Sequence, residues 1–384
     1  MRQTARHLFL PLAIALALGA CSDSNNNNKK EPPVSIETPN ADRCEILDSG
    51  NCMFPWPSSA FTVADDATET GLRVNLNQES MPANQLGVFV DPTEWNRNDG
   101  FSPSQMILAQ VPGIDLEQTG TPPITDLEQS LSADSPVVVI RASTGEQHLI
   151  FAELDANTDD PVEQTFIIRP MIQFERGERY IVALRNMRGA DGELLEAPEV
   201  FRAFRDDTLT DNDAIEGRRD AMEDIFGILG DAGIAREELY LAWDFNIASV
   251  ENITERILHI RDDAFASLGN AAPEFTVTEV TDYAPCGEDS CEDGQDRYKS
   301  RSIIGTFQVP NYLNSDEGGP GSPFFYDTPD DGLPDRIGGD NMFTATFYCS
   351  VARSVAEDFD AAPKAVARPS LYGHGLLGLS LIHI

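Results

Sequence analysis

The sequence predicts an α+β protein whose N-terminal region combines an antiparallel, sandwich-like β-sheet with helices, followed by a second region rich in strands. Three observations carry this prediction. Short alternating or β-branched runs recur between residues 136 and 185, glycine-containing turns separate them, and an apolar repeat with a helical period follows. The chain of 384 residues is also long enough to form two domains with cores of their own.

The N-terminal domain is expected to span residues 41–270. Its first half holds runs of strand-forming residues with Thr-Gly, Arg-Gly and Asp-Gly turns between them, a pattern typical of hairpins in an antiparallel sheet. These predicted strands cover residues 136–141, 147–154, 165–169 and 179–185.

Two helices are expected in the second half of this domain, with a compact strand at residues 239–245 between them. Apolar residues at positions i, i+3, i+4 and i+7 predict the first helix: Met222, Ile225, Phe226 and Leu229. Ser249 is suited to cap the second helix, because its hydroxyl can accept a backbone N–H of the first turn. The core stripe of that helix is predicted to consist of Val250, Ile253, Ile257 and Leu268.

The N-terminus is predicted to be a lipoprotein signal peptide, residues 1–20. A basic flank at Arg2 and Arg6 precedes an apolar run over residues 8–18, and the sequence Leu-Gly-Ala-Cys ends at Cys21. The apolar run is too short to span a bilayer, so it is not a transmembrane helix. Cys21 is therefore expected to carry the lipid; an ordinary cleaved signal with a chance cysteine is the alternative.

Residues 21–40 are polar and are expected to act as a flexible tether. A serine at position 22, where aspartate would retain a bacterial lipoprotein in the inner membrane, favours an outer-membrane lipoprotein that faces the periplasm or the cell surface. The chain has 27 basic and 64 acidic residues, a formal net charge of −37. This excess argues against nucleic acid as a partner, and leaves the N-terminal lipid as the expected contact with the membrane.

Five further cysteines are consistent with export. Cys44 and Cys52 enclose one short loop and Cys286 and Cys291 another, so each pair is predicted to form a local disulfide in an oxidising compartment. A metal site is less favoured, because neither pair has the two-residue spacing usual for zinc. Cys349 is expected either to be a buried thiol in a strand or to pair with a cysteine beyond these 384 residues.

One acidic segment resembles a calcium-binding loop. Asp327, Asp331 and Asp335 occupy positions 1, 5 and 9 of that pattern, and Gly332 stands at position 6. Proline and glycine, however, replace the ligands expected at positions 3 and 12. A solvated acidic loop is the favoured interpretation, calcium the alternative, and no other cofactor is expected.

A second domain is expected over residues 271–378. Its strands are predicted at residues 275–280, 302–309, 343–351 and 367–372. The last of these leads directly into the sequence Gly373-His374-Gly375-Leu376-Leu377-Gly378.

This turn resembles the His-Gly-x-x-Gly oxyanion loop of bacterial lipases and esterases. The order of export signal, β-rich region and late second domain is similar to that of secreted or lipid-anchored α/β-hydrolases. The resemblance implies that residues 271–378 begin an α/β-hydrolase domain. It also implies that Leu376 donates its backbone N–H to an oxyanion, that His374 braces the loop and that Gly375 permits close approach. The implied activity is hydrolysis of small-molecule or lipid carboxylic esters.

The nucleophile of such an enzyme is missing from the sequence. No Gly-x-Ser-x-Gly motif occurs, and His383 alone follows His374 as a candidate base. Residues 379–384 are interpreted as read-through of a sequencing adapter, and the chain as an inactive N-terminal fragment of a lipid-anchored serine hydrolase. The alternatives are a non-enzymatic surface lipoprotein whose β-rich domain binds a partner, and a calcium-stabilised adhesion module.

Overall fold

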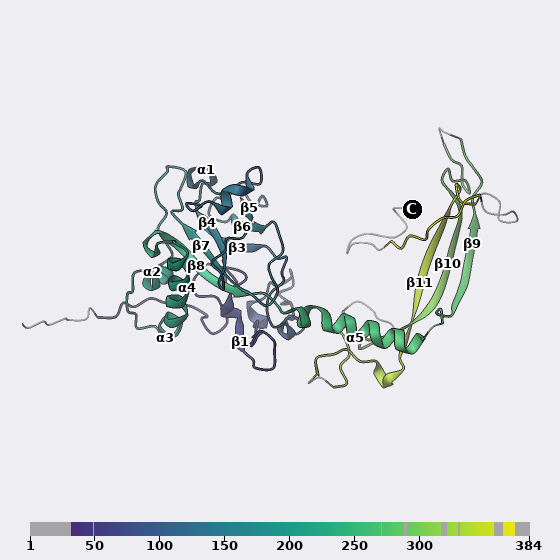
Figure 1. Ribbon diagram of the computed structural model, residues 1–384, viewed down its shortest axis with the longest axis horizontal. Coiled ribbons are helices and arrows are strands. Elements are labelled where there is room, and N and C mark those ends of the chain that lie inside the picture. Colours follow the sequence, from purple (N-terminus) through teal and green to yellow (C-terminus); the bar gives the residue numbers. More distant parts are fainter. Residues whose placement is uncertain are drawn as a thin grey trace, which may run out of the picture.

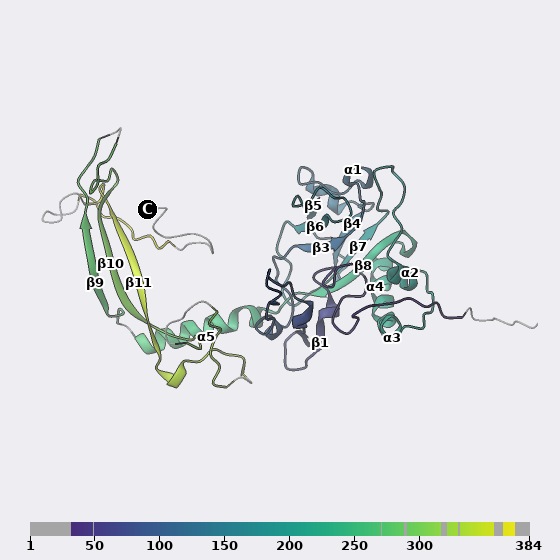
Figure 2. The ribbon, with the colours of Figure 1, turned by 180° about the vertical axis from the view of Figure 1, so that it is seen from behind.

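The computed structural model describes residues 32–48, 50–269, 271–287, 290–315, 321–328, 331–356 and 364–372. Residues 32–248 form a packed unit, which we call the N-terminal body. A single long helix, α5 (Val250–Leu268), leads away from it to a three-stranded sheet, as Figures 1 and 2 show. This distal sheet consists of β9 (Phe275–Asp282), β10 (Lys299–Pro310) and β11 (Met342–Ala352).

Three small antiparallel sheets build the N-terminal body. The first pairs β1 (Thr62–Ala64) with β2 (Leu72–Val74). The second has the order β3 (Ile107–Gln110), β6 (Thr165–Pro170), β5 (Ile150–Leu154). The third has the order β4 (Val137–Arg141), β7 (Arg179–Arg185), β8 (Leu239–Asn246). The predicted strands over residues 136–185 are therefore present, but they are divided between two sheets.

Helices cover the third sheet. α2 (Glu199–Arg205) and α4 (Arg219–Asp231) pack against β8 beside the short α3 (Asp213–Glu216), while α1 (Leu116–Thr119) lies apart from them (Figure 1). The apolar stripe predicted for α4 is confirmed, because Met222, Ile225, Phe226 and Leu229 are its buried residues. Every residue of β7 after Arg179 is buried, so this sheet has protein on both faces.

The start of α5 is fixed to the N-terminal body. The Ser249 hydroxyl accepts the backbone N–H of Asn252 at 3.0 Å, which confirms the predicted cap. The buried carboxylate of Asp99 in turn accepts the N–H of Ser249 at 2.9 Å. These two bonds satisfy donors at the helix end that would otherwise lack partners.

The predicted core stripe of α5 is wrong. The helix has no buried residue, and Ile257 is 61% exposed. Its C-terminal half contacts the connection between β10 and β11, where the Tyr312 hydroxyl donates to Asp263 Oδ2 at 2.6 Å. Arg336 pairs with the same carboxylate at 3.1 Å. The helical periodicity therefore predicted the helix correctly, but it did not reveal that the apolar face would remain exposed.

The predicted fold class is also wrong. Instead of one sandwich-like sheet followed by the start of an α/β-hydrolase domain, the described residues form four antiparallel sheets of two or three strands with few helices. The distal sheet has the order β11-β10-β9, and both pairings are antiparallel. No parallel core is present in the described ranges. A parallel sheet needs crossover connections, usually helical, whereas neither connection within this sheet contains an α-helix among its described residues.

Candidate functional site

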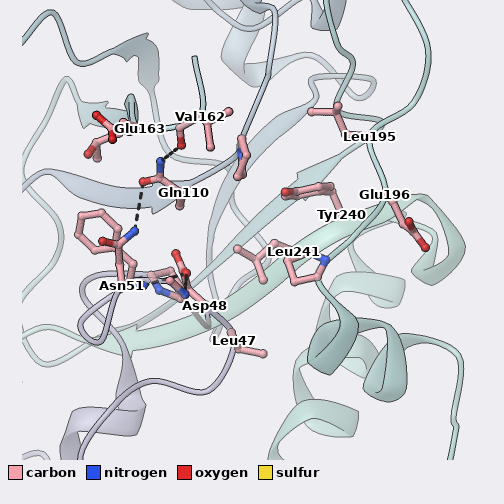
Figure 3. Close-up of a pocket in the computed structure, with 16 residues that line it drawn as sticks. Leu47, Asp48, Asn51, Gln110, Val162, Glu163, Leu195, Glu196, Tyr240 and Leu241 are labelled. Atoms are coloured by element: carbon pink, nitrogen blue, oxygen red, sulfur yellow. Dashed lines mark hydrogen bonds between the residues drawn. The ribbon is translucent and has the colours of Figure 1, made fainter. Parts of the chain in front are cut away.

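A large cavity lies in the N-terminal body, between the disulfide-closed loop and β8. It has a volume of about 880 Å³ and is the space shown in Figure 3. Asp48 and Asn51 reach it from the loop, Gln110 from the end of β3, and Tyr240 and Leu241 from β8. The connections before β6 and α2 close its remaining sides. Its size falls within the range of ordinary small-ligand pockets.

The loop beside the cavity is held by covalent and polar contacts. Cys44 and Cys52 form the predicted disulfide. Between them, the buried carboxylate of Glu45 pairs with Arg218 and accepts the Ser58 hydroxyl at 2.5 Å. The disulfide and the ion pair therefore fix both ends of the loop before it reaches the cavity.

A chain of hydrogen bonds joins the loop to the second sheet. Asp48 Oδ1 accepts the backbone N–H groups of Gly50 and Asn51, at 2.8 and 3.1 Å. The Asn51 amide donates to Gln110 Oε1 at 3.4 Å, and Gln110 Nε2 donates to the Val162 carbonyl at 2.7 Å (Figure 3). The amide groups around the cavity are thus occupied by the protein itself.

Two polar groups at the cavity keep an unused capacity for hydrogen bonds. Asp48 Oδ2 is shielded from solvent and has no hydrogen-bond partner among the described residues. Tyr240 is only 6% exposed, and its hydroxyl, which points into the cavity in Figure 3, makes no hydrogen bond with any described residue. Buried polar groups in native proteins are normally paired, so the Tyr240 hydroxyl, which faces the cavity, is the group that a ligand or water there could complete.

Burial shifts the pKa of both side chains. Burial raises the pKa of the Asp48 carboxyl, and its backbone hydrogen bonds partly oppose that rise. Burial, reinforced by the nearby Asp48 charge, raises the pKa of Tyr240 to about 12. The tyrosine is therefore a neutral hydroxyl near pH 7, able both to donate and to accept a hydrogen bond.

A second notable surface lies on α5 and the distal sheet. Every described side chain of β9 is exposed or half-buried, including Phe275 at 66% and Val280 at 50%. The rings of Phe275 and Phe307 both lie 6.3 Å from that of Phe347, which extends across Gly305 where a side chain would collide with it. Aromatic and aliphatic side chains thus gather on a sheet that no described element covers.

The predicted site residues have mixed outcomes. Both predicted disulfides, Cys44–Cys52 and Cys286–Cys291, are present, as expected for an oxidising compartment. The lipidation candidate Cys21 and the oxyanion-loop candidates lie outside the described residues; the latter are His374, Gly375 and Leu376. Cys349, for which burial was one expectation, is instead an exposed free thiol on β11.

The calcium candidates are only partly brought together. Asp335 Oδ2 accepts the backbone N–H of Asp327 at 2.9 Å, whereas Asp331 accepts that of Leu333 at 3.0 Å. These carboxylates therefore act as turn-stabilising acceptors. Over the ranges that the structure describes, no three acidic, histidine or cysteine side chains are grouped as metal ligands would be.

Neither Asp48 nor Tyr240 was predicted to be a site residue. Asp48 lies in an Asp-Ser-Gly-Asn sequence that is typical of an ordinary loop, and Tyr240 lies in the compact strand predicted at residues 239–245. The one available signal was a tyrosine hydroxyl within an apolar strand, because a buried hydroxyl requires a partner.

Comparisons with known proteins do not assign the chain to a group. No protein-family model, curated protein or solved structure matches it. In the described segments, no helix is sufficiently long and apolar to cross a lipid bilayer.

Proposed function

We propose that this chain is the N-terminal part of an exported, lipid-anchored serine hydrolase that acts on carboxylic esters. The observation that carries the proposal is the uncovered apolar surface of the distal sheet and α5, which precedes the His-Gly-x-x-Gly motif of residues 374–378 in the chain. Soluble proteins rarely leave large connected apolar patches exposed unless another part of the protein or a partner covers them.

The remainder of the catalytic domain would cover this surface and supply the nucleophile. The backbone N–H of Leu376 would then help to stabilise the tetrahedral oxyanion, because a preorganised donor is most effective where negative charge develops. The N-terminal body, with its own closed core and the Cys44–Cys52 disulfide, would stand between the lipid anchor and the catalytic domain.

The proposal is tested first on the gene and then on the protein. Sequence of the source locus beyond codon 378 should continue into a strand, a Gly-x-Ser-x-Gly motif, an acidic residue and a histidine. The longer protein should hydrolyse p-nitrophenyl esters and react with a fluorophosphonate probe, whereas the present 384 residues should do neither. A stop codon directly after codon 384, or turnover by the present chain, would contradict the proposal.

A backbone variant separates the oxyanion role from a general effect on folding. In the longer protein, Leu376→Pro removes the proposed donor and should lower kcat by about 10²–10³-fold. Leu376→Ala keeps the N–H and should retain most of the activity. Equal losses in the two variants would show that the side chain, and not the backbone donor, is what matters.

A further inference from the structure

The cavity beside β8 is lined by one polar side chain that is both buried and unpaired. Tyr240 is more than nine-tenths buried, its hydroxyl faces the cavity, and it makes no hydrogen bond with any described residue. A hydroxyl withdrawn from water without a partner lowers the stability of the folded state. Tyr240 is therefore held where a molecule inside the cavity would satisfy it.

The carboxylates around the cavity are not available to pair with the charge of a ligand. Asp48 directs Oδ1 to two backbone N–H groups, and its Oδ2 is shielded from solvent. Glu196 is paired with Arg202, and Glu163 is exposed to water. No lysine or arginine is among the described lining residues. A charged ligand of either sign would therefore lose hydration on entry without gaining a paired charge, which favours a neutral ligand.

Most of the remaining lining is apolar. The loop, β8 and the connections before β6 and α2 contribute leucine, phenylalanine, valine and proline side chains: Leu47, Phe54, Val162, Leu195, Pro198 and Leu241. The amide side chains of Asn51 and Gln110 also line the cavity, but they are hydrogen-bonded to each other. Such walls suit the body of an organic molecule, and a cavity of about 880 Å³ has room for one of ordinary ligand size.

The protonation state of the Tyr240 hydroxyl decides which polar group the ligand should carry. Burial and the nearby Asp48 charge raise its pKa to about 12, so the hydroxyl keeps its proton near pH 7 and needs an acceptor. The carbonyl oxygen of a ketone, ester or amide accepts this proton in a hydrogen bond. A ligand that only donates would use the lone pair of the hydroxyl and leave the phenolic hydrogen unpaired.

We propose that this cavity binds a neutral, largely apolar organic molecule through a carbonyl group that accepts a hydrogen bond from the Tyr240 hydroxyl. The apolar part of the molecule packs against the leucine, proline and phenylalanine walls. The Cys44–Cys52 disulfide and the Glu45–Arg218 pair hold the loop at one side of the cavity, so little ordering of that loop is required on binding. The site is separate from the proposed oxyanion loop, so failure of either proposal leaves the other standing.

The ligand class is tested by NMR titration of the purified chain with probes that have the same number of non-hydrogen atoms. Acetophenone carries the carbonyl group, and benzoate and benzamidine present a negative and a positive charge on the same ring. Acetophenone should bind at least about tenfold more tightly than either ion, because only the ions lose a charged group's hydration. Equal binding of either ion, or no saturable binding of acetophenone at millimolar concentration, would overturn the proposal.

The role of the hydroxyl is tested by removing it. Cumene, in which a methyl group replaces the carbonyl oxygen of acetophenone, is the second probe. Tyr240→Phe should weaken acetophenone binding about threefold to tenfold, and it should leave cumene binding as tight or tighter, because the hydrocarbon makes no hydrogen bond. Tyr298→Phe, at an exposed position next to β10, makes the same chemical change outside the cavity and should alter both affinities less than about twofold.

Unchanged acetophenone affinity in Tyr240→Phe, or an equal loss for both probes, would contradict the hydrogen bond. The same loss in Tyr298→Phe would place binding on the distal sheet and also contradict the assignment. If Tyr240→Phe does not give a melting transition like that of the parent chain, the order of the probes in the parent chain still tests the ligand class.

Discussion

β7 in the N-terminal body and β10 in the distal sheet are both central strands with antiparallel neighbours on each side. Their surroundings differ. β7 is buried on both faces after its first residue, whereas β10 lies between β9 and β11, on which no described side chain is buried. Strand pairing is thus common to the two regions, and burial of apolar surface, the dominant stabilising term in folding, distinguishes them.

Hydrogen exchange should give the largest difference between the two regions. In the 384-residue chain, amides of β10 should exchange at least about a hundredfold faster than those of β7, because exposed sheets open locally while core strands open only on global unfolding. Peptide-resolved mass spectrometry measures both strands in one sample, so each is the other's control. Equal protection of β7 and β10 would remove the distinction.

Truncation of an aromatic side chain should show the same difference in stability. Trp243 is fully buried, and its indole N–H donates to the Pro57 carbonyl at 2.8 Å. Trp243→Ala should lower the free energy of unfolding of the N-terminal body by about 3–5 kcal/mol. Phe275→Ala, at an exposed position of β9, is the comparison and should change it by less than about 0.5 kcal/mol. Urea denaturation measures both, and similar losses would show that Phe275 belongs to a core.

Ion pairs extend the comparison to buried and exposed charges. Glu45 is fully buried at its side chain and paired with Arg218, so Arg218→Met leaves a buried carboxylate without its cation. We expect a loss of about 2–4 kcal/mol in the free energy of unfolding. The cross-strand pair of Arg169 with Glu153 is partly exposed, and Arg169→Met should cost less than about 1 kcal/mol. Equal costs in urea denaturation would mean that the Glu45 carboxylate finds another partner.

The sequence predicted well those features that depend on residues close together in the chain. The apolar stripe of α4, the Ser249 cap and the two disulfides were all identifiable because spacing or a single hydroxyl determines them. The same reasoning predicted strands at residues 136–141 and 179–185, which correspond to β4 and β7.

Patterns could not show how strands would combine or what would cover them. The strand runs after residue 271 suit parallel and antiparallel pairing equally, and an expected strand at residues 367–372 is exposed chain without strand pairing to any described residue. The apolar stripe of α5 likewise fits a core position, yet Ile257 is exposed. Tyr240 was missed as a site residue because its role depends on a loop almost two hundred residues earlier in the chain.

Acidification should have the smallest effect on the free energy of unfolding, and it should act through His148 in the N-terminal body. Its ring stacks on Phe174 at 4.4 Å, its Nε2 lies 3.0 Å from the Ile172 carbonyl oxygen, and burial lowers its pKa below the usual 6.5. The charged groups near it are Arg141, which also lowers the pKa, and Glu146 and Glu175, which raise it.

Because the unfolded chain takes up this proton near pH 6.5 and the folded chain resists it, stability should decline as the pH falls from about 6.5 toward the lowered pKa. His148→Phe keeps an aromatic ring beside Phe174 and removes the titrating group, so the free energy of unfolding should change less between about pH 7.5 and about pH 5.5 than it does in the parent chain. The readout is this pH dependence and not the absolute stability, which the lost contact with the Ile172 carbonyl will also alter. An unchanged pH dependence in the variant would assign the acid sensitivity to other groups and leave His148 as a packing residue.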